Sequence, residues 1–229
     1  MPASAPAPGY VVNTEIDLRS ITEQGAISYF FQRVFEISVA SIALIITSPL
    51  ILVVAFIIGR GTPGPILFRQ QRLGKGAIPF AFTKFRTLYA DARERWPELY
   101  AYEYTQEELN DLVFKVQNDP RVTPEGLWLR KSTLDELPNF WNVITGEMAL
   151  VGPRPEIPEM LSYYRGEGLS KFHVRPGVTG LAQISGRGRL NFNDTVELDA
   201  EYVRTRSFLL DLKIIALTVL KIVTRDGAF

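Results

Sequence analysis

The chain has 229 residues, equal numbers of acidic and basic side chains (25 each), no cysteine and a single histidine. This charge balance argues against a nucleic-acid partner, because a dedicated nucleic-acid-binding domain is usually strongly basic. The absence of cysteine excludes disulfides and thiolate chemistry, and one histidine excludes multi-histidine metal sites. Any catalysis must therefore use carboxylates, lysines, arginines or a hard metal ion.

An uncharged run of 22 residues, 37–58, follows a proline- and alanine-rich start at 1–14 that predicts a loose tail. At about 1.5 Å per residue, a helix of this length can cross the hydrocarbon core of a bilayer. Pro49 lies inside the run, where it removes the hydrogen bond to the carbonyl of Ile45 and predicts a kink. The hydroxyl of Ser48 can supply the partner that this carbonyl loses. The residues alone leave a kinked spanning helix and a re-entrant hairpin, which enters and leaves the same leaflet, close to even.

Basic residues dominate the segment after this run. Residues 61–90 contain two lysines and three arginines but no acid, and residues 168–193 also lack acids. Such blocks are ordinarily solvated faces, but they also suit an anionic ligand or lipid headgroups. The expected local structures are a strand at 78–88, a helix at 89–100, a loop at 118–126 and an apolar helix at 208–223.

The densest candidate for chemistry is the segment 129–156. Apolar residues recur in it at spacings of three and four, which predicts a helix near 133–145 with one apolar face. Thr133 and Glu136 fit a capping box, and Asp135 in a first helical turn would interact well with the helix dipole. Taken alone, this pattern favours carboxylates that only stabilise the start of a helix.

Nearby arginines favour a different interpretation of the same carboxylates. Arg154 stands between two prolines in "VGPRP", which is a stiff loop, and Arg130 lies five residues before Asp135. Mg²⁺ prefers oxygen ligands, and an arginine fork binds phosphate through two hydrogen bonds. Two carboxylates beside rigid arginines therefore suit a phosphate bound with Mg²⁺.

Four motifs resemble, in order, the bacterial sugar transferases known as monotopic polyprenyl-phosphate phosphoglycosyl transferases. They are "TPGPILFRQQRLGKGAIPFAFTKFRTL", "DELPNFWNVITGEMALVGPRPE", "RPGVTGLAQISGRGR" and "ELDAEYVRTRSFLLDLKI". The resemblance implies transfer of a sugar 1-phosphate from a UDP-sugar to polyprenyl (undecaprenyl) phosphate, with release of UMP. It places this reaction at the cytoplasmic face of the bacterial inner membrane. It also implies that Ser48 and Pro49 break the apolar run into a re-entrant hairpin.

Matched position by position, the resemblance implies that Asp135 is a nucleophile and forms a covalent aspartyl-phosphosugar intermediate. Glu136 is implied to hold Mg²⁺. The residues implied to bind phosphate or nucleotide are Lys84, Arg86, Arg130, Arg154, Arg175 and Arg187. The alternative role of Lys84 and Arg86 is contact with lipid headgroups, and that of Arg175, in "RPG", is packing of a turn. Asp199 and Asp211 match further carboxylates of the last motif, whose roles stay open.

The expected fold is α+β, largely helical and monotopic, with a small β element. Three parts are predicted: an N-terminal tail at 1–27, a re-entrant helix-break-helix hairpin at 28–60, and a cytoplasmic catalytic domain with amphipathic membrane-associated helices at 61–229. The expected cofactor is Mg²⁺. The expected partners are a UDP-sugar, polyprenyl phosphate and membrane lipids but not nucleic acid, and a homo-oligomer is compatible with the sequence.

Two other functions fit the same residues. A non-catalytic, membrane-anchored protein would use the carboxylates as helix caps and the arginines to bind anionic lipid. A Mg²⁺-dependent phosphohydrolase would use the same metal site without a lipid acceptor. The sequence identifies neither the sugar nor the glycoconjugate or exopolysaccharide pathway.

Overall fold

A computed structural model describes residues 25–113, 118–186 and 189–224, and these form a mostly helical chain with little sheet. The α-helices are α1 (Ala26–Arg60), α2 (Ala92–Arg95), α3 (Gln106–Asp111), α4 (Pro124–Ser132), α5 (Asn139–Thr145), α6 (Leu181–Gly186), α7 (Phe192–Thr205) and α8 (Phe208–Thr224). The strands are β1 (Leu67–Leu73), β2 (Pro79–Phe85), β3 (Ala149–Val151) and β4 (Gly177–Thr179). Short 3-10 helices are η2 (Lys75–Ala77), η3 (Pro97–Tyr100), η4 (Leu134–Glu136), η5 (Pro158–Tyr163) and η6 (Gly166–His173). The expectation of a largely helical chain with a small β element is confirmed.

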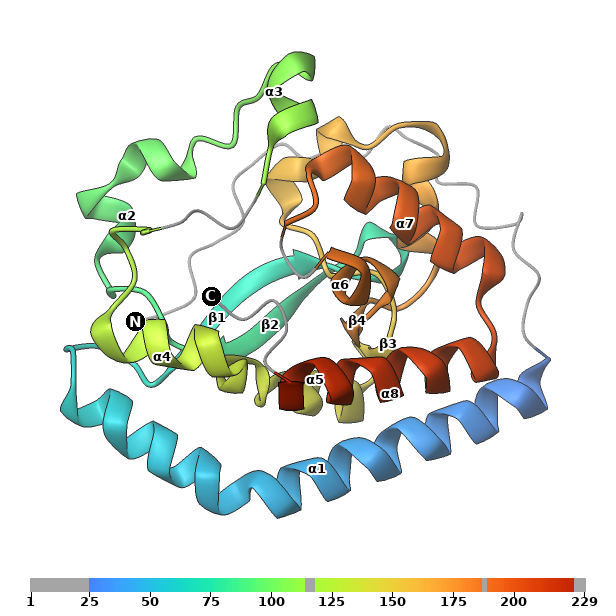
Figure 1. The fold of residues 1–229 in the computed structure, drawn as a ribbon, viewed down its shortest axis with the longest axis horizontal. Coiled ribbons are helices and arrows are strands. Elements are labelled where there is room, and N and C mark those ends of the chain that lie inside the picture. The colour runs from blue at the N-terminus through green and yellow to red at the C-terminus, as the bar shows by residue number, and fades with distance from the viewer. Residues whose placement is uncertain (1–24, 114–117, 187–188, 225–229) are drawn as a thin grey trace.

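The long helix α1 lies along one side of the molecule, next to α4, α5 and α8 (Figure 1). In the same view (Figure 1) the antiparallel hairpin β1–β2 lies between α1 and the pair α3 and α7, and alternate residues along much of both strands are exposed. The hairpin register pairs Leu67 with Phe85 and Leu73 with Pro79. A second, two-stranded sheet pairs β3 with β4 in parallel. This arrangement puts the predicted chemistry, at the end of α4 and after β3, above a layer of helices.

Pro49 lies inside α1, and the helix bends near its middle (Figure 1). The hydroxyl of Ser48 donates to the carbonyl oxygen of Ile45 at 2.8 Å, as predicted from the sequence. That bond satisfies the acceptor which the proline leaves without an N–H partner, so the helix continues instead of stopping. The expected break between two separate arms is therefore a bend within one continuous helix.

Both arms of α1 pack against the rest of the protein. Ala40 of the first arm is fully buried in a core that includes residues of β2, α5, β3, α7 and α8. Val54 and Ile58 of the second arm are buried against Phe85 and Leu129. The bend lets one helix follow the curved surface of a single domain at both ends.

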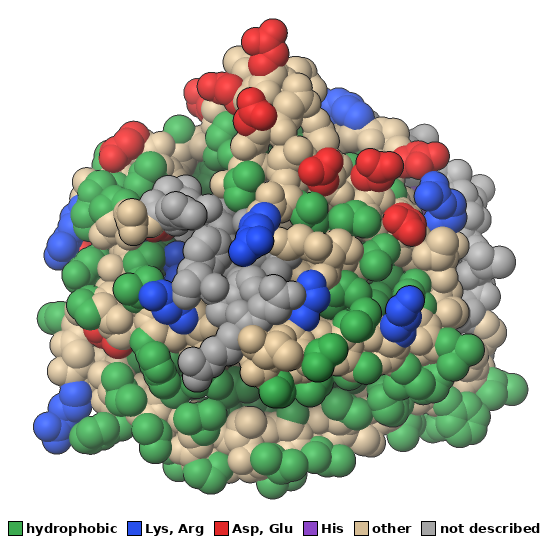
Figure 2. Space-filling view, in the orientation of Figure 1, with side chains coloured by type: hydrophobic (Ala, Val, Ile, Leu, Met, Phe, Trp, Pro, Cys, Tyr) green, Lys and Arg blue, Asp and Glu red, His purple; other side chains and the backbone are tan. Residues whose placement is uncertain are grey.

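The opposite face of α1 is apolar and exposed. Its large exposed side chains include Ile45, Ile46, Leu52 and Phe56, which are 60–72% exposed. The helix is long and apolar enough to cross a bilayer, and only 11% of its most apolar stretch is buried inside the protein. Hydrophobic side chains gather along this edge of the molecule (Figure 2). Such an extended apolar surface is typical of contact with lipid or with another protein.

Two groups of polar contacts hold the two ends of α1. In the N-terminal clamp, Glu36 is buried and pairs with Arg33 at 2.7 Å and with Arg175 at 2.9 Å. In the C-terminal clamp, Glu125 accepts hydrogen bonds from the backbone N–H and the hydroxyl of Thr62, at 2.8 and 2.7 Å. Undocking the helix would leave the charges of Arg175 and the buried Glu36 without each other, and would also break the two hydrogen bonds to Glu125, so both clamps favour the docked position.

Candidate active site

The carboxylates Asp135 and Glu136 lie on a tight turn between α4 and α5. Helix α4 ends at Ser132, its C-cap residue Thr133 has a left-handed backbone with φ of 58°, and η4 follows directly. Thr133 makes no side-chain cap, so the predicted capping box does not form. The helix expected near 133–145 begins only at Asn139, because the left-handed residue redirects the chain before it. The turn leaves Asp135 only 6% exposed.

Burial raises the pKa of Asp135 to about 6, and the neighbouring charge of Glu136 adds to this effect. The opposing influences are the positive charges of Lys84, Arg154 and Arg130, which favour the ionised form. Asp135 is thus a desolvated carboxylate within the field of three cations. A strongly perturbed acid of this kind, with identifiable charged neighbours, is a physical marker of a functional site.

Glu136 and Arg154 form the shortest ion pair of the cluster. A terminal nitrogen of Arg154 lies 2.6 Å from Oε1 of Glu136, and the arginine side chain remains 44% exposed. The charge of Glu136 raises the pKa of Arg154. Pro153 and Pro155 restrict the backbone on both sides of the arginine, as the sequence predicted. The exposed guanidinium can therefore meet a ligand while one of its nitrogens stays paired with Glu136.

Lys84 and Arg130 approach Asp135 from two other elements. Lys84 is on β2, and burial lowers its pKa to about 8 although the charge of Asp135 acts in the opposite direction. Arg130, in the last turn of α4, donates to the hydroxyl of Thr87 at 3.1 Å and lies 3.8 Å from Asp119. The charges of three cations from separate parts of the chain therefore act on one carboxylate, which suits the binding of a phosphate.

The other predicted site residues lie elsewhere. Arg86 donates four hydrogen bonds to the segment after α1, namely to Thr62, Pro63 and Pro65. Arg175 is part of the N-terminal clamp and also donates to the carbonyl of Met148. Arg86 thus holds the backbone that follows α1, and Arg175 holds α1 itself through Glu36. Arg187 lies outside the described residues.

The two further carboxylates are also away from the cluster. Asp199 is 1% exposed and pairs with Lys171 at 3.2 Å. Asp211 accepts a hydrogen bond from the hydroxyl of Tyr202 at 2.8 Å, and burial raises its pKa to about 6. Each instead joins helices that support the site.

Sequence reasoning did not single out Arg72 or Asp119. Arg72 of β1 donates to the carbonyl of Pro155 at 3.0 Å, and its charge helps to lower the pKa of Lys84. Asp119 receives bonds from Arg121 at 2.9 Å and faces Arg130. The available signals were the acid-free block that contains Arg72 and the "NDPRV" loop, but neither pattern specifies which distant residue it meets.

The carboxylate pair fits a Mg²⁺ ion that is shared with a phosphate. Among the described residues, no group of three or more His, Cys, Asp and Glu side chains is placed to hold a metal. Mg²⁺ does not require such a cage, since it is commonly bound by one or two carboxylates, water and substrate phosphate. Asp135 and Glu136 repel each other, and the amide of the buried Asn139 has no hydrogen-bond partner within the described part of the chain. A divalent cation beside this turn would relieve the repulsion.

Comparisons with known proteins identify the family of this chain. The family model described as "Bacterial sugar transferase" matches residues 27–225. "UDP-galactose-lipid carrier transferase" of Erwinia amylovora is 36% identical over 88% of this chain and 42% of its own length. "Exopolysaccharide production protein ExoY" of Rhizobium meliloti is 36% identical over 86% of this chain and 88% of its own length. "UDP-glucose:undecaprenyl-phosphate glucose-1-phosphate transferase" of Klebsiella pneumoniae is 40% identical over 85% of this chain and 40% of its own length.

These matches differ in how much of the relative they cover. The chain spans only about two fifths of the Erwinia and Klebsiella proteins but most of the Rhizobium one. The family model itself extends from the start of α1 to the end of α8, and therefore includes both the apolar helix and the carboxylate cluster. By its sequence, the chain belongs to the bacterial sugar transferase family.

Proposed function

We propose that this protein is a polyprenyl-phosphate phosphoglycosyl transferase, which moves a sugar 1-phosphate from a UDP-sugar to polyprenyl phosphate and releases UMP. The names of the relatives support the transfer of a sugar phosphate to undecaprenyl phosphate and a place in exopolysaccharide synthesis. The observation that carries the proposal is a desolvated carboxylate, Asp135, surrounded by three cations beside the Glu136–Arg154 pair. This reaction would be the first membrane step of glycoconjugate or exopolysaccharide assembly.

In the first step, an oxygen of the Asp135 carboxylate attacks the β-phosphorus of the UDP-sugar. A new acyl phosphate bond forms, the bond between the β-phosphorus and the bridging oxygen breaks, and UMP leaves with the electron pair. In the second step, a phosphate oxygen of the polyprenyl phosphate attacks the same phosphorus and releases the Asp135 carboxylate. Two displacements allow a water-soluble donor and a lipid acceptor to use one site in turn.

The cations around Asp135 have separate tasks in this scheme. Arg154 is rigid and exposed, so it suits the transferring phosphate, whose charge grows in the transition state. Lys84 and Arg130 lie close enough to favour the ionised nucleophile. Glu136, with Asp135, would hold Mg²⁺, which supplies further charge neutralisation at the phosphates.

The membrane position follows from α1 and its neighbours. We infer a re-entrant, monotopic helix because both clamps join α1 to the same domain, whereas a spanning helix would put its two ends on opposite sides of the bilayer. Apolar side chains on neighbouring helices extend the surface, including Leu127, Trp128, Trp141 and Leu209, which are 45–77% exposed. In a bacterium, the catalytic domain would then lie on the cytoplasmic face of the inner membrane, with lipids as partners.

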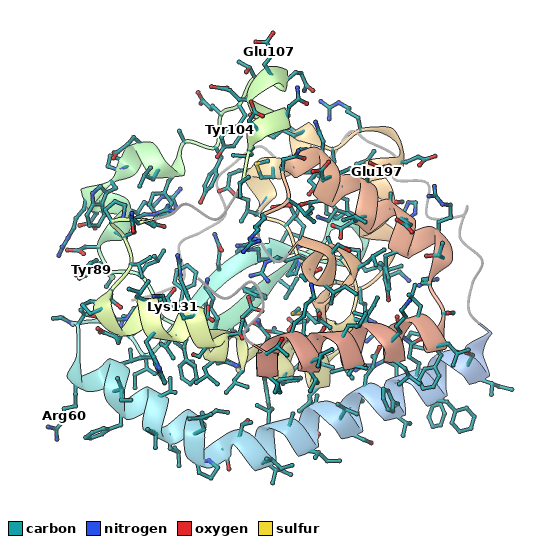
Figure 3. All side chains as sticks on the ribbon, in the orientation of Figure 1. Arg60, Tyr89, Tyr104, Glu107, Lys131 and Glu197 are labelled. Atoms are coloured by element: carbon teal, nitrogen blue, oxygen red, sulfur yellow. The ribbon has the colours of Figure 1, made fainter. Side chains whose placement is uncertain are left out.

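The charge distribution supports the same orientation. Glu107 of α3 and Glu197 of α7 are exposed on the side away from α1, whereas Arg60 lies at the end of α1 (Figure 3). Acidic side chains also gather on that far side in the space-filling view (Figure 2). Anionic headgroups attract basic residues and repel acidic ones, so the α1 side is the one suited to the membrane.

Incubation with a UDP-sugar and Mg²⁺, but without lipid acceptor, tests the proposal. The intact mass is expected to rise by one sugar phosphate, and peptide mapping is expected to place it on Asp135. Asp135→Asn should prevent labelling because the amide is a poor nucleophile of the same shape. A lipid-binding protein would release no UMP, and a phosphohydrolase would release free sugar phosphate. A label on any other residue would refute the role of Asp135.

A further inference from the structure

The loop that carries Arg154 is held firmly on its N-terminal side. The backbone N–H of Gly152 donates to the carbonyl of Thr179 at 2.9 Å. The N–H of Gly177 donates to the carbonyl of Pro153 at 2.9 Å. These bonds join the start of the loop to β4, so the backbone before Arg154 has little freedom.

On the C-terminal side, the same loop is held by β1. Arg72 donates to the carbonyl of Pro155 at 3.0 Å, and the N–H of Leu73 donates to the carbonyl of Glu156 at 2.7 Å. Glu156 also accepts a bond from the N–H of Ile157 through its own side chain, at 3.0 Å. The carboxylate of Glu156 thus directly shapes the turn just after Arg154 and Pro155.

Behind Glu156 lies a buried polar cluster that the proposed mechanism does not use. The hydroxyl of Tyr164 donates to Oε2 of Glu156 at 2.6 Å and accepts a bond from Nζ of Lys171 at 2.8 Å. Lys171 also lies 3.5 Å from Glu156 and 3.2 Å from Asp199. All four residues are at most 8% exposed. These contacts connect the loop that carries Arg154 with η6 and α7.

This cluster is in an apolar environment. Tyr164 belongs to a core with Leu73, Ile157, Met160 and Phe172. Ions in such surroundings lose their hydration, and well-packed apolar side chains often stabilise a core at least as well as a buried ion pair. Stability alone therefore gives little reason for an ionic cluster here. A need to hold the carboxylate of Glu156 in one position would explain it.

We propose that Tyr164 and Lys171 are positioning residues, which hold Glu156 and thereby set the direction of Arg154 toward the transferring phosphate. Asp199 supports Lys171 from α7. Loss of the Tyr164 hydroxyl removes the short hydrogen bond to Oε2 of Glu156, leaves this oxygen only the longer 3.5 Å contact with Lys171, and thereby loosens the turn that follows Arg154. This inference rests on the proposed phosphosugar transfer, because Arg154 is the residue through which it acts.

The chain offers a matched control in the adjacent tyrosine. The hydroxyl of Tyr163 accepts from the N–H of Tyr104 at 2.9 Å and donates to the carbonyl of Tyr102 at 3.2 Å. Tyr104 lies near α3, on the side away from α1 (Figure 3). Tyr163→Phe therefore removes the same atom from a hydrogen bond to a different segment, without touching the Arg154 loop.

Single-turnover labelling of the full chain with a UDP-sugar and Mg²⁺ separates positioning from folding. We expect Tyr164→Phe to slow the labelling rate constant about tenfold, which corresponds to about 1.4 kcal/mol, with an unchanged amplitude. Tyr163→Phe should stay within about twofold of the unmodified protein. A variant that is merely less folded would lose amplitude and keep its rate constant. Equal rate constants for the two variants would overturn the proposal.

A double-mutant cycle tests whether Tyr164 acts through Arg154. In an Arg154→Lys background, Tyr164→Phe should slow labelling by less than about threefold, since the fork that it positions is already absent. The full tenfold effect in that background would refute the connection. If Tyr164→Phe does not fold, Glu156→Gln replaces it in the same cycle, because an amide cannot accept both bonds of the carboxylate. No UMP release by the unmodified chain would instead refute the proposed function itself.

Discussion

Replacing Asp135 by asparagine should make the ligand-free protein more stable while it abolishes transfer. Burial raises the pKa of Asp135 from its ordinary 3.8 to about 6, so above pH 6 the folded protein carries a charge that its surroundings disfavour. At about 1.4 kcal/mol for each pH unit, the cost is about 3 kcal/mol. For a chain of this size, that corresponds to a rise in Tm of about 6–12 °C. Asparagine keeps the shape and removes the charge.

The sign of this effect depends on pH in a defined way. Between about pH 4 and 6, Asp135 is protonated in the folded state and ionised in the unfolded state, so stability of the unmodified protein falls as pH rises. Asparagine does not titrate. The advantage of Asp135→Asn should therefore be absent near pH 4, grow through this window and be complete above pH 6. Thermal unfolding in detergent at pH 4.5 and 8, without Mg²⁺, measures it.

Asp119 supplies the matched control. Burial opposes its ionisation, but hydrogen bonds and charge from Arg121 outweigh burial and lower its pKa. Asp119→Asn should therefore reduce Tm at pH 8, which is the opposite of the Asp135 result. Mg²⁺ should narrow the gap between the unmodified protein and Asp135→Asn, because it compensates the carboxylate. An Asp135→Asn variant that is no more stable at pH 8 would refute the desolvation argument.

Three further outcomes are expected. The rate of UMP release should depend on pH in a bell shape with apparent pKa values near 6 and 8, because Asp135 must be ionised and Lys84 must be charged. Lys84→Arg should move only the alkaline limb of this profile, to higher pH. Arg154→Lys should reduce kcat by about 100-fold with an unchanged Tm, since an ammonium cannot replace the two-pronged fork, and near-normal turnover would exclude a phosphate role. Cysteines at Ser28 and Pro63 should react alike with an impermeant reagent in intact cells; opposite accessibility would exclude the re-entrant helix, whereas Pro49→Ala should shift the chain toward spanning.

Local features of the fold could be predicted from the sequence because their partners are close along the chain. The bond from Ser48 to the carbonyl of Ile45 spans three residues, so the proline and the hydroxyl define it together. Strand β1 was not predicted, since its less exposed face carries Phe68, Gln70 and Arg72 and does not alternate as an apolar strand would. Thr133 shows the limit of local rules, because its left-handed backbone overrides a capping pattern.

The candidate site divides in the same way. Asp135, Glu136 and Arg154 occur within one motif, and the structure brings them together. Arg86 and Arg175 share the same residue type and the same basic blocks, but their partners are backbone carbonyls and Glu36, which no local pattern identifies. Residue type and motif thus indicated the chemistry, while the distribution of arginines between ligand and scaffold depended on tertiary contacts.

The docking of α1 has a practical consequence for protein engineering. A fragment of residues 61–229 would uncover Phe85 and Leu129, which α1 keeps at most 1% exposed, and would leave the guanidinium of Arg175 without Glu36. Such a fragment should aggregate instead of yielding a soluble catalytic domain. For the same reason, exchanging α1 for an unrelated anchor should fail even when the new segment binds lipid well. The anchor and the enzyme have to be expressed, purified and redesigned as one piece.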